Sequence, residues 1–284
     1  MPNQSTHQNS PSQKSAHPAS HLPTKIVTIG SVQIGGPQFT VIAGPCSIES
    51  EKQLKDTGDA VKASGASLLR GGIWKMRTSL KSFQGLGEES FQFIKKVKSE
   101  IGLPLISEVT DARQIEELAS VVDAYQVGAR NMHNYSLLKE LGRQPKPVLL
   151  KRNFSAFIDE WLKASEYILN EGNEQVILCE RGIRTFETAT RNTLDLNAVV
   201  YAKKHSQLPV IVDPSHAVGI SELVAPLCYA SAAAGADGLI VEVHPNPAAA
   251  LSDGAQALNF QSFDQMMRQL EKVLNAFDRG LNRL

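Results

Sequence analysis

Reactive or charged side chains stand at the carboxyl end of nearly every short apolar run in this 284-residue sequence. Cys46 follows VIAGP, Glu108 follows LIS, Arg130 follows YQVGA, and His216 comes shortly after VIV. If each apolar run is a buried parallel strand, these positions share one face of the molecule, because parallel strands of a closed sheet end together. The pattern therefore predicts a single site built from residues far apart in the sequence.

Four side chains at these positions are of the types that bind a divalent transition metal: Cys46, His216, Glu242 and Asp253. A thiolate, an imidazole and two carboxylates together favour Mn, Fe, Co, Zn or Cu over Mg or Ca. Their spacing follows no local metal-binding pattern, so only the fold could bring them together. The alternatives are that Cys46 is a buried apolar side chain, His216 a helix cap or core residue, and Asp253 a turn cap.

Cationic side chains form a second set at the same strand ends. Arginine suits the carboxylate and phosphate groups of a small anion, and lysine supplies a point charge. The backbone amides around Gly128 and Ala129 add donors for a phosphate oxygen. The alternative is that these cations pair with acidic residues in surface loops. The set comprises Arg70, Lys75, Arg77, Arg130, Lys151, Arg152, Arg181 and Arg184.

Composition excludes several other functions. The 29 Lys and Arg residues balance 29 Asp and Glu residues, so no long-range field attracts nucleic acid or an anionic membrane. No apolar run reaches the roughly 18 residues of a membrane-spanning helix, and no secretory signal is evident. The three cysteines are too few for a disulfide framework and indicate reduced thiols or metal ligands. We therefore expect a cytoplasmic protein with no nucleic-acid or membrane partner.

An alternation of strand and helix patterns must position these residues. Runs such as PVLL, QVILC and GLIVEV are typical of strands buried on both faces, and the stretches between them have helical spacing. Eight strands alternating with helices predict a (β/α)8 TIM barrel. An open doubly wound sheet is the alternative, but no glycine-rich dinucleotide motif follows the first strand. The expected strands are 40–43, 67–70, 104–108, 124–127, 147–151, 175–179, 209–212 and 238–243.

The region before the barrel has two parts. Residues 1–24 are rich in Ser, Gln, Asn, His and Pro, which predicts a disordered tail. The following sequence, KIVTIGSVQIGG, predicts an N-terminal β-hairpin over about 25–36. We thus expect a tail over 1–24 and a single domain over 25–284 that contains the hairpin and the barrel.

Several segments resemble a known enzyme family in order along the chain, from about residue 25 to the C-terminus. They are AGPCSIES, LLRGGIWKMRTSLKSFQGLG, QVGARNMHN, LLKRNFSAFIDEW, ILCERGIRTFE, VIVDPSHAVG and EVHPNPAAALSDGAQ. The family is 3-deoxy-D-arabino-heptulosonate 7-phosphate (DAHP) synthase, in the branch related to 3-deoxy-D-manno-octulosonate 8-phosphate synthase. The resemblance implies a (β/α)8 barrel that condenses phosphoenolpyruvate, erythrose 4-phosphate and water and releases phosphate. That reaction is the first step of the shikimate pathway to aromatic amino acids.

The resemblance also implies roles for individual residues. One divalent ion, Mn²⁺, Fe²⁺, Co²⁺ or Zn²⁺, would be held by Cys46, His216, Glu242 and Asp253. Phosphoenolpyruvate would be bound by Arg70, Lys75, Arg130, Lys151 and Arg181, with Glu108, Gly128 and Ala129 beside it in the substrate site. The phosphate of the sugar would meet Arg77 and Thr78. The catalytic residues would be Lys75, Cys46 and His216.

Lys75 is the expected proton donor to the alkoxide that forms from the aldehyde. Crowding by Arg70 and Arg77 is expected to lower the pKa of Lys75 and ease that transfer. Water on the metal is the alternative donor.

Two positions depart from the family pattern. Met76 and Leu80 replace the prolines of the usual KPRTSP loop, so we expect a more flexible loop and a raised KM for the sugar phosphate. Asn153 stands where a glycine often follows Lys-Arg, which either changes the approach of Lys151 or has no effect.

Two alternatives to the main function stay open. The manno-octulosonate 8-phosphate synthases use arabinose 5-phosphate, but their loop typically reads KANRS, whereas Arg77 and Thr78 directly follow Met76 here. A non-catalytic relative that binds phosphorylated metabolites is the second, against which the complete metal set argues. The resemblance further implies a homo-oligomer, a dimer or a tetramer.

Overall fold

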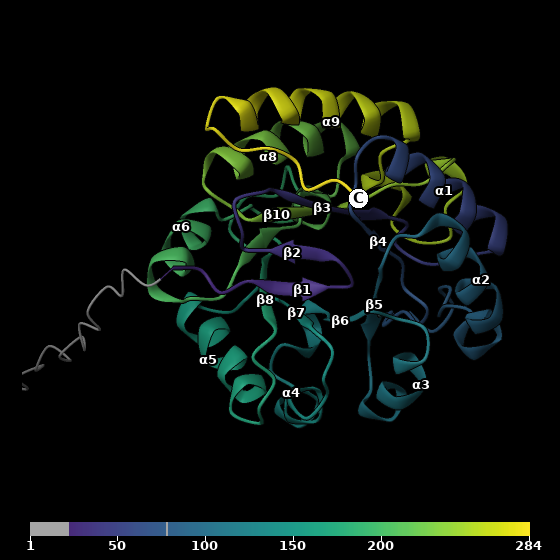
Figure 1. Ribbon diagram of the computed structural model, residues 1–284, viewed down its shortest axis with the longest axis horizontal. Coiled ribbons are helices and arrows are strands. Elements are labelled where there is room, and N and C mark those ends of the chain that lie inside the picture. The colour runs from purple at the N-terminus through teal and green to yellow at the C-terminus, as the bar shows by residue number, and fades with distance from the viewer. Residues whose placement is uncertain (1–22, 78) are drawn as a thin grey trace, which may run out of the picture.

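The computed structural model describes residues 23–77 and 79–284. Eight parallel strands close into a barrel in the order β10-β3-β4-β5-β6-β7-β8-β9, which confirms the predicted fold (Figure 1). Each strand differs from its predicted range by at most one residue at either end. The strands are β3 (Thr40–Gly44), β4 (Leu68–Arg70), β5 (Leu105–Val109), β6 (Ala124–Val127), β7 (Val148–Lys151), β8 (Val176–Glu180), β9 (Val210–Val212) and β10 (Gly238–Glu242). The predicted tail over 1–24 falls outside the described residues except for positions 23 and 24.

Helices surround the barrel and cover the outer faces of its strands (Figure 1). They are α1 (Glu51–Ala63), α2 (Phe91–Ile101), α3 (Ile115–Ala119), α4 (Tyr135–Gly142), α5 (Ile158–Leu169), α6 (Leu196–His205), α8 (Ser221–Ala233) and α9 (Phe260–Asn275). A shorter helix, α7 (Pro214–Val218), directly follows β9. Short 3-10 turns occupy Gly87–Ser90, Ala112–Gln114, Ala129–Asn131, Pro247–Ala249 and Gly254–Gln256. Within the described ranges, no helix is both long and apolar enough to cross a membrane.

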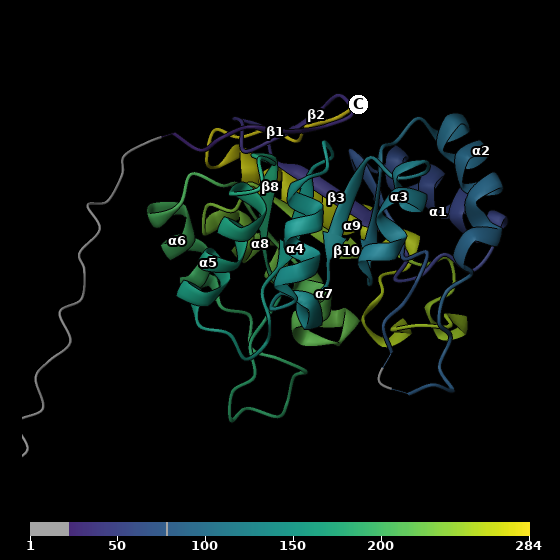
Figure 2. The same cartoon turned by 90° about the horizontal axis from the view of Figure 1, so that it is seen from below.

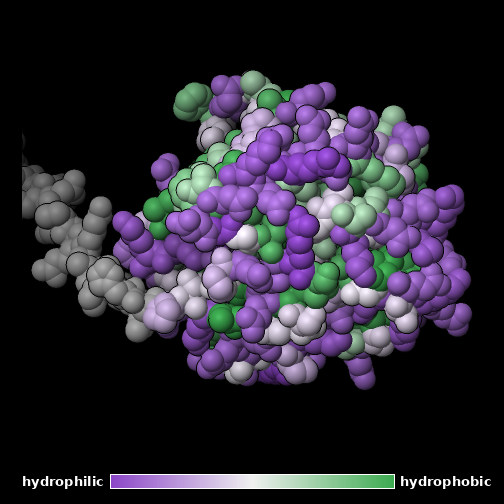
Figure 3. Space-filling view, turned by 45° about the horizontal axis from the view of Figure 1, so that its top comes forward, coloured by the Kyte–Doolittle hydropathy of each residue, from purple (hydrophilic) through white to green (hydrophobic). Residues whose placement is uncertain are grey.

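Helix α9 is strongly amphipathic. Its apolar stripe, which includes Phe263, Met267 and Leu270, is buried, as we expect for a helix that packs on the core. Hydrophilic side chains cover most of the face drawn in Figure 3, with smaller hydrophobic areas between them. Burial of this apolar stripe therefore holds α9 on the barrel.

The predicted hairpin is present as β1 (Val27–Ile29) and β2 (Val32–Ile34), which pair antiparallel. Both strands alternate buried and exposed residues. The buried side chains form one cluster with Ile42, Leu149 and other side chains that point into the barrel. Figure 2 shows the hairpin at one end of the barrel and the longest loops at the other end. The hairpin thus fills the end of the barrel opposite those loops.

Truncation of a hairpin side chain that fills this end destabilises the fold. We expect Ile34→Ala to lower the free energy of unfolding by about 2–5 kcal/mol, because it leaves a cavity in a fully buried cluster. The measurement is a chemical denaturation curve. Thr28→Ala, on the exposed face of the same hairpin, is the control and should cost less than about 0.5 kcal/mol. An equal loss of unfolding free energy in both variants would contradict the conclusion that the buried face of the hairpin fills this end of the barrel.

Candidate active site

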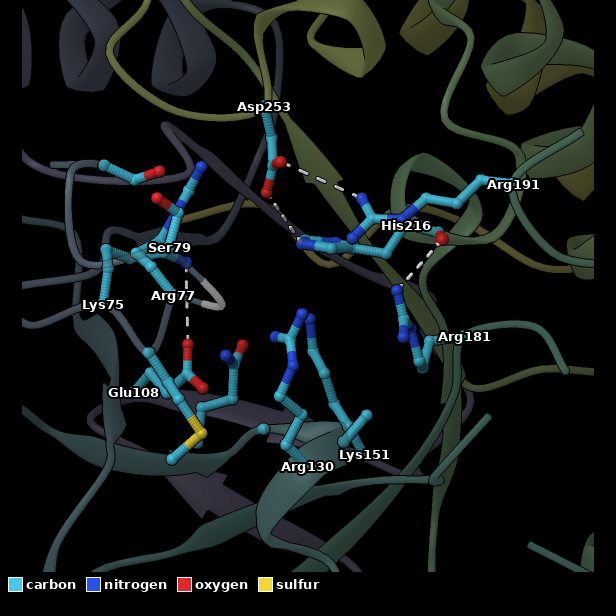
Figure 4. A pocket seen from close by; sticks show the side chains of 15 residues that line it. Lys75, Arg77, Ser79, Glu108, Arg130, Lys151, Arg181, Arg191, His216 and Asp253 are labelled. Carbon is cyan, nitrogen blue, oxygen red and sulfur yellow. Dashed lines mark hydrogen bonds and ion pairs between the residues drawn. The ribbon is translucent and has the colours of Figure 1, made fainter. Parts of the chain in front are cut away.

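The loops that follow the carboxyl ends of the strands enclose a cavity of about 250 Å³ (Figure 4). Lys75 and Glu108 lie on one side of this cavity, and Arg181 and Arg191 lie on the other. Most residues predicted for the site line it: Lys75, Arg77, Glu108, Gly128, Ala129, Arg130, Lys151, Arg181, His216 and Asp253. Cys46 and Arg70 line a smaller depression that shares Lys75 and Glu108 with the main cavity. Thr78 lies outside the described residues.

The four residues predicted as metal ligands come together at the wall of this cavity. One donor atom from each of Cys46, His216, Glu242 and Asp253 lies within 4.8 Å of the other three. The Cys46 thiol donates to Asp253 Oδ2 at 3.2 Å, and His216 Nε2 lies 3.3 Å from Glu242 Oε1. These atoms come from the ends of three strands, β3, β9 and β10, so no local spacing in the sequence could reveal the set.

The donor set fits a divalent transition metal. Within residues 23–77 and 79–284, Glu242 Oε1 is buried without a hydrogen bond, although an Arg70 nitrogen lies 3.1 Å away. A buried carboxylate oxygen with no donor requires a compensating cation. Burial, then the nearby Glu242, raises the pKa of the Cys46 thiol to about 12. A metal ion must therefore displace this proton when it binds the sulfur.

Asp213 orients the metal-ligand candidate His216. Asp213 caps α7, where its Oδ1 accepts the backbone N–H of His216 at 3.0 Å. Asp213 Oδ2 lies 2.8 Å from His216 Nδ1, although the two groups are not aligned as a hydrogen bond. The same oxygen accepts a hydrogen bond from Lys151 Nζ at 2.5 Å. A carboxylate against Nδ1 keeps the proton there and leaves the Nε2 lone pair directed at the metal position.

The charges of this group suit that role. Burial opposes ionisation of Asp213, but His216 and Lys151 outweigh it and hold the pKa of the Asp213 carboxyl well below its usual value. Burial also lowers the pKa of His216, despite the nearby Asp213 and Glu242 carboxylates. A neutral imidazole beside an ionised carboxylate is the state that binds a metal. Asp213 directly follows the apolar run VIV in the sequence, but only the structure shows that it joins two site residues.

Two buried arginines, Arg70 and Arg181, have guanidinium nitrogens free to bind an anionic ligand, as far as the described residues show. Arg70 is 3% exposed, and its Nε and Nη1 atoms make no hydrogen bond to any described residue. Arg181 Nε is also buried without a partner in the described part of the chain, while its Nη2 donates to the His216 carbonyl at 3.0 Å. Buried guanidinium donors without acceptors indicate a site for an anionic ligand.

One glycine permits this arrangement. A Cβ atom added to Gly128 would lie 2.1 Å from Glu108 Oε1, so a larger residue at this position would displace the Glu108 carboxylate. The other carboxylate oxygen, Glu108 Oε2, lies 3.6 Å from Lys75 Nζ.

The prediction that Lys75 has a lowered pKa is wrong. Burial does disfavour its charge, but the Cys46 sulfur and the Glu108 carboxylate outweigh burial and the repulsion of Arg70, so the pKa of Lys75 is raised. The sequence shows the neighbouring cations in the same segment but not the acidic groups that the fold brings from other strands.

Two cations expected at this site lie elsewhere. Arg152 is buried and pairs with Glu180 at 3.0 Å and Asp195 at 2.9 Å, so it anchors the loop before α6. Arg184 stacks on the Phe154 ring, 4.1 Å from its centroid. Neither lines the cavity.

Arg191 is a cavity residue that the sequence analysis missed. It donates to Gln256 Oε1 at 2.9 Å, and Gln256 Nε2 donates to Glu242 Oε2 at 2.7 Å. No apolar run precedes Arg191, so the strand-end pattern could not find it.

Asn153, which stands where the family often has glycine, donates from its side-chain amide to the Ala129 carbonyl at 2.9 Å. It therefore ties the loop after β7 to the backbone that forms the cavity floor.

Comparison with known proteins identifies similar sequences over most of the chain. Residues 13–277 match a model described as the DAHP synthetase I family. The phospho-2-dehydro-3-deoxyheptonate aldolase of Thermotoga maritima is 46% identical over 262 residues, which cover 92% of this chain and 78% of the relative. The 2-dehydro-3-deoxyphosphooctonate aldolase of Geobacter sulfurreducens is 31% identical over 273 residues, which cover 88% of this chain and 98% of the relative.

Solved structures agree with these matches. The crystal structure of the Thermotoga maritima phospho-2-dehydro-3-deoxyheptonate aldolase (DAHP synthase) has a TM-score of 0.89 and 46% identity, covering 92% of this chain and 77% of that one. A truncated form of the 3-deoxy-D-arabino-heptulosonate 7-phosphate synthase of the same organism has a TM-score of 0.86 and 43% identity, covering 92% and 96% of the two chains.

Removal of the Asp213 charge weakens metal binding. We expect Asp213→Asn to lower the affinity for Co²⁺ by about 10–100-fold, because the amide no longer holds the His216 proton on Nδ1. The measurement is a Co²⁺ titration followed by the thiolate-to-cobalt charge-transfer band of Cys46. Asp195→Asn is the matched control, since Asp195 also caps a helix and pairs with a buried arginine but lies outside the cavity. Unchanged Co²⁺ affinity in Asp213→Asn would refute the orienting role.

Proposed function

The chain belongs to the DAHP synthetase I family, and we infer that it condenses phosphoenolpyruvate with erythrose 4-phosphate and water. The products are 3-deoxy-D-arabino-heptulosonate 7-phosphate and phosphate, the first step of the shikimate pathway and of aromatic amino acid biosynthesis. The observation that carries this inference is that four metal-type donors lie together beside a cavity lined by cations, with two of the donors, His216 and Asp253, in the lining itself. A reaction that joins two phosphorylated substrates at an aldehyde can use both features, cations for the phosphates and a Lewis acid for the aldehyde.

The proposed phosphoenolpyruvate site lies over Arg70, Arg130, Lys151 and Arg181. Arg70 and Arg181 have buried guanidinium nitrogens that make no hydrogen bond to any described residue. These nitrogens supply donors for the carboxylate and the phosphate of phosphoenolpyruvate. The phosphate of erythrose 4-phosphate is assigned to Arg77 and Thr78, on the loop after β4. Neutralising two polyanions in this way removes their mutual repulsion and orients them for reaction.

One divalent metal ion, held by Cys46, His216, Glu242 and Asp253, is proposed as the cofactor. When bound, the metal supplies a Lewis acid for the aldehyde oxygen, which makes the aldehyde carbon more electrophilic. Mn²⁺, Fe²⁺, Co²⁺ and Zn²⁺ all suit the mixed thiolate, imidazole and carboxylate donors.

The proposed condensation proceeds through the following bond changes in the cavity. C3 of phosphoenolpyruvate forms a bond to the aldehyde carbon, and the aldehyde oxygen takes a proton from Lys75. Water adds to C2 and gives up one proton. The bond from C2 to the phosphate oxygen then breaks, the C2 hydroxyl becomes the ketone, and its proton leaves with the phosphate. The proton from water balances the one on the new hydroxyl. Because the pKa of Lys75 is raised, its ammonium is present at neutral pH and stabilises the developing alkoxide before the proton moves.

Identity to the relatives favours the four-carbon acceptor. The Thermotoga maritima heptonate aldolase is 46% identical to this chain, and the Geobacter sulfurreducens octonate aldolase is 31% identical. The order Arg77-Thr78 in the loop points the same way. A homo-oligomer, a cytoplasmic location and the division into a tail over 1–24 and one domain over 25–284 are proposed from the sequence.

The substrate and metal assignments are tested together by phosphate release. We expect activity with phosphoenolpyruvate and erythrose 4-phosphate, loss of that activity in EDTA, and recovery when Mn²⁺ is added back. Arabinose 5-phosphate in place of erythrose 4-phosphate is the control. Activity only with the pentose phosphate would assign the octulosonate reaction instead, and activity that survives full chelation would remove the metal from the mechanism.

Restoring a loop proline tests the binding of the sugar phosphate. Met76 and Arg77 line the cavity, and the Met76 N–H makes no hydrogen bond to a described residue that proline would break. Met76→Pro should lower the KM for erythrose 4-phosphate by about two- to five-fold, equivalent to about 0.4–1 kcal/mol of loop entropy. Steady-state kinetics measures it, and the KM for phosphoenolpyruvate serves as the internal control. An unchanged KM for the sugar would rule out the flexible-loop hypothesis.

A further inference from the structure

Two residues outside the cavity join the segments that carry metal-ligand candidates. Glu49 follows Cys46 on the segment after β3, and His244 is the second residue of the segment after β10 that leads to Asp253. Glu49 Oε2 lies 3.3 Å from His244 Nε2, and Glu49 Oε1 accepts the backbone N–H of Leu251 at 2.8 Å. We call this three-residue arrangement the Glu49 clasp. Neither Glu49 nor His244 lines the cavity.

The imidazole of the clasp has a defined orientation. The backbone N–H of Asn246 donates to His244 Nδ1 at 3.1 Å, so Nδ1 carries the lone pair and Nε2 carries the proton. The Nε2 proton therefore points to the Glu49 carboxylate. His244 is 5% exposed, and its backbone N–H is held by the Leu258 carbonyl at 2.9 Å. The ring is thus fixed on both sides and gives Glu49 a rigid partner.

Hydrogen bonds, rather than packing, hold the segment that ends at Asp253. Its side chains from 245 to 251 are exposed or half-buried, and Leu251 is 53% exposed. Ser252 Oγ lies 2.7 Å from Ser47 Oγ, so a second polar contact joins the same two segments next to Cys46. Asp253 has a φ of 50°, in the left-handed region that residues other than glycine seldom adopt. Such a conformation persists only where its surroundings impose it.

We propose that Glu49 is a positioning residue for the metal site. By holding His244 and Leu251 at the two ends of the segment after β10, it keeps the Asp253 carboxylate beside the Cys46 thiol, where the two are 3.2 Å apart. The proposal rests on the metal site inferred above. It assigns Glu49 no contact with either substrate.

The test compares metal affinity with phosphoenolpyruvate affinity in the full-length protein. Glu49→Ala removes both clasp contacts, and we expect it to weaken Co²⁺ binding by about 10–100-fold, the usual effect of losing support for a metal ligand. Glu49→Gln keeps one acceptor oxygen but cannot accept from both His244 and Leu251, so its loss should be intermediate. The Cys46 charge-transfer band reports Co²⁺ binding. Calorimetric titration of phosphoenolpyruvate into the EDTA-treated variants should give the wild-type affinity.

Glu51→Ala is the matched control, because Glu51 lies two positions away but is exposed and, among residues 23–77 and 79–284, pairs only with the surface residue Lys96. This variant should bind Co²⁺ as the wild type does. Wild-type Co²⁺ affinity in both Glu49 variants would overturn the proposal, as would an equal weakening of Co²⁺ and phosphoenolpyruvate binding, which indicates general damage. If the unaltered protein itself shows no charge-transfer band with Co²⁺, the metal site fails as well, and the two failures are thereby distinguished.

Discussion

Two fully buried carboxylates, Asp213 and Glu242, are the constraint on which the site depends. A buried charge is costly unless it is paired, so each carboxylate must keep its cationic or polar partners close. Asp213 contacts Lys151 and His216, and Glu242 contacts Arg70 and the same His216. Each carboxylate therefore touches one cation of the proposed anion site and one ligand of the proposed metal site. The two sites share their compensating charges and cannot be placed independently.

The barrel makes this charge network possible. Parallel strands deliver side chains from distant parts of the sequence to one end, and the N-terminal hairpin fills the opposite end with apolar side chains. The interior below the site is therefore packed with apolar side chains, and this low-polarity surrounding strengthens the electrostatic interactions above it. The loops carry the adjustable parts of the site, such as Arg77 on the loop after β4 and Asp253 on the loop after β10.

The sequence was sufficient for the fold, because buried parallel strands are nearly continuous apolar runs and their ends are marked by polar residues. The sequence also indicated which metal-binding side chains gather at the carboxyl end of the barrel, since the ends of parallel strands in a closed barrel converge. It could not show contacts between elements. The raised pKa of Lys75, the bridge made by Asp213 and the diversion of Arg152 into the pair with Glu180 all depend on side chains from other strands. Arg191 was missed because it lies in a polar loop, where the chain has no apolar run to mark its position.

A crystal structure of the protein with Mn²⁺ and phosphoenolpyruvate, with anomalous diffraction measured at the manganese edge, tests the shared-charge arrangement most directly. We expect the anomalous peak among Cys46, His216, Glu242 and Asp253, with Asp213 still between His216 and Lys151 and the substrate on the neighbouring arginines. A peak away from these four residues, or a substrate bound with Asp213 turned away from His216, would contradict the arrangement.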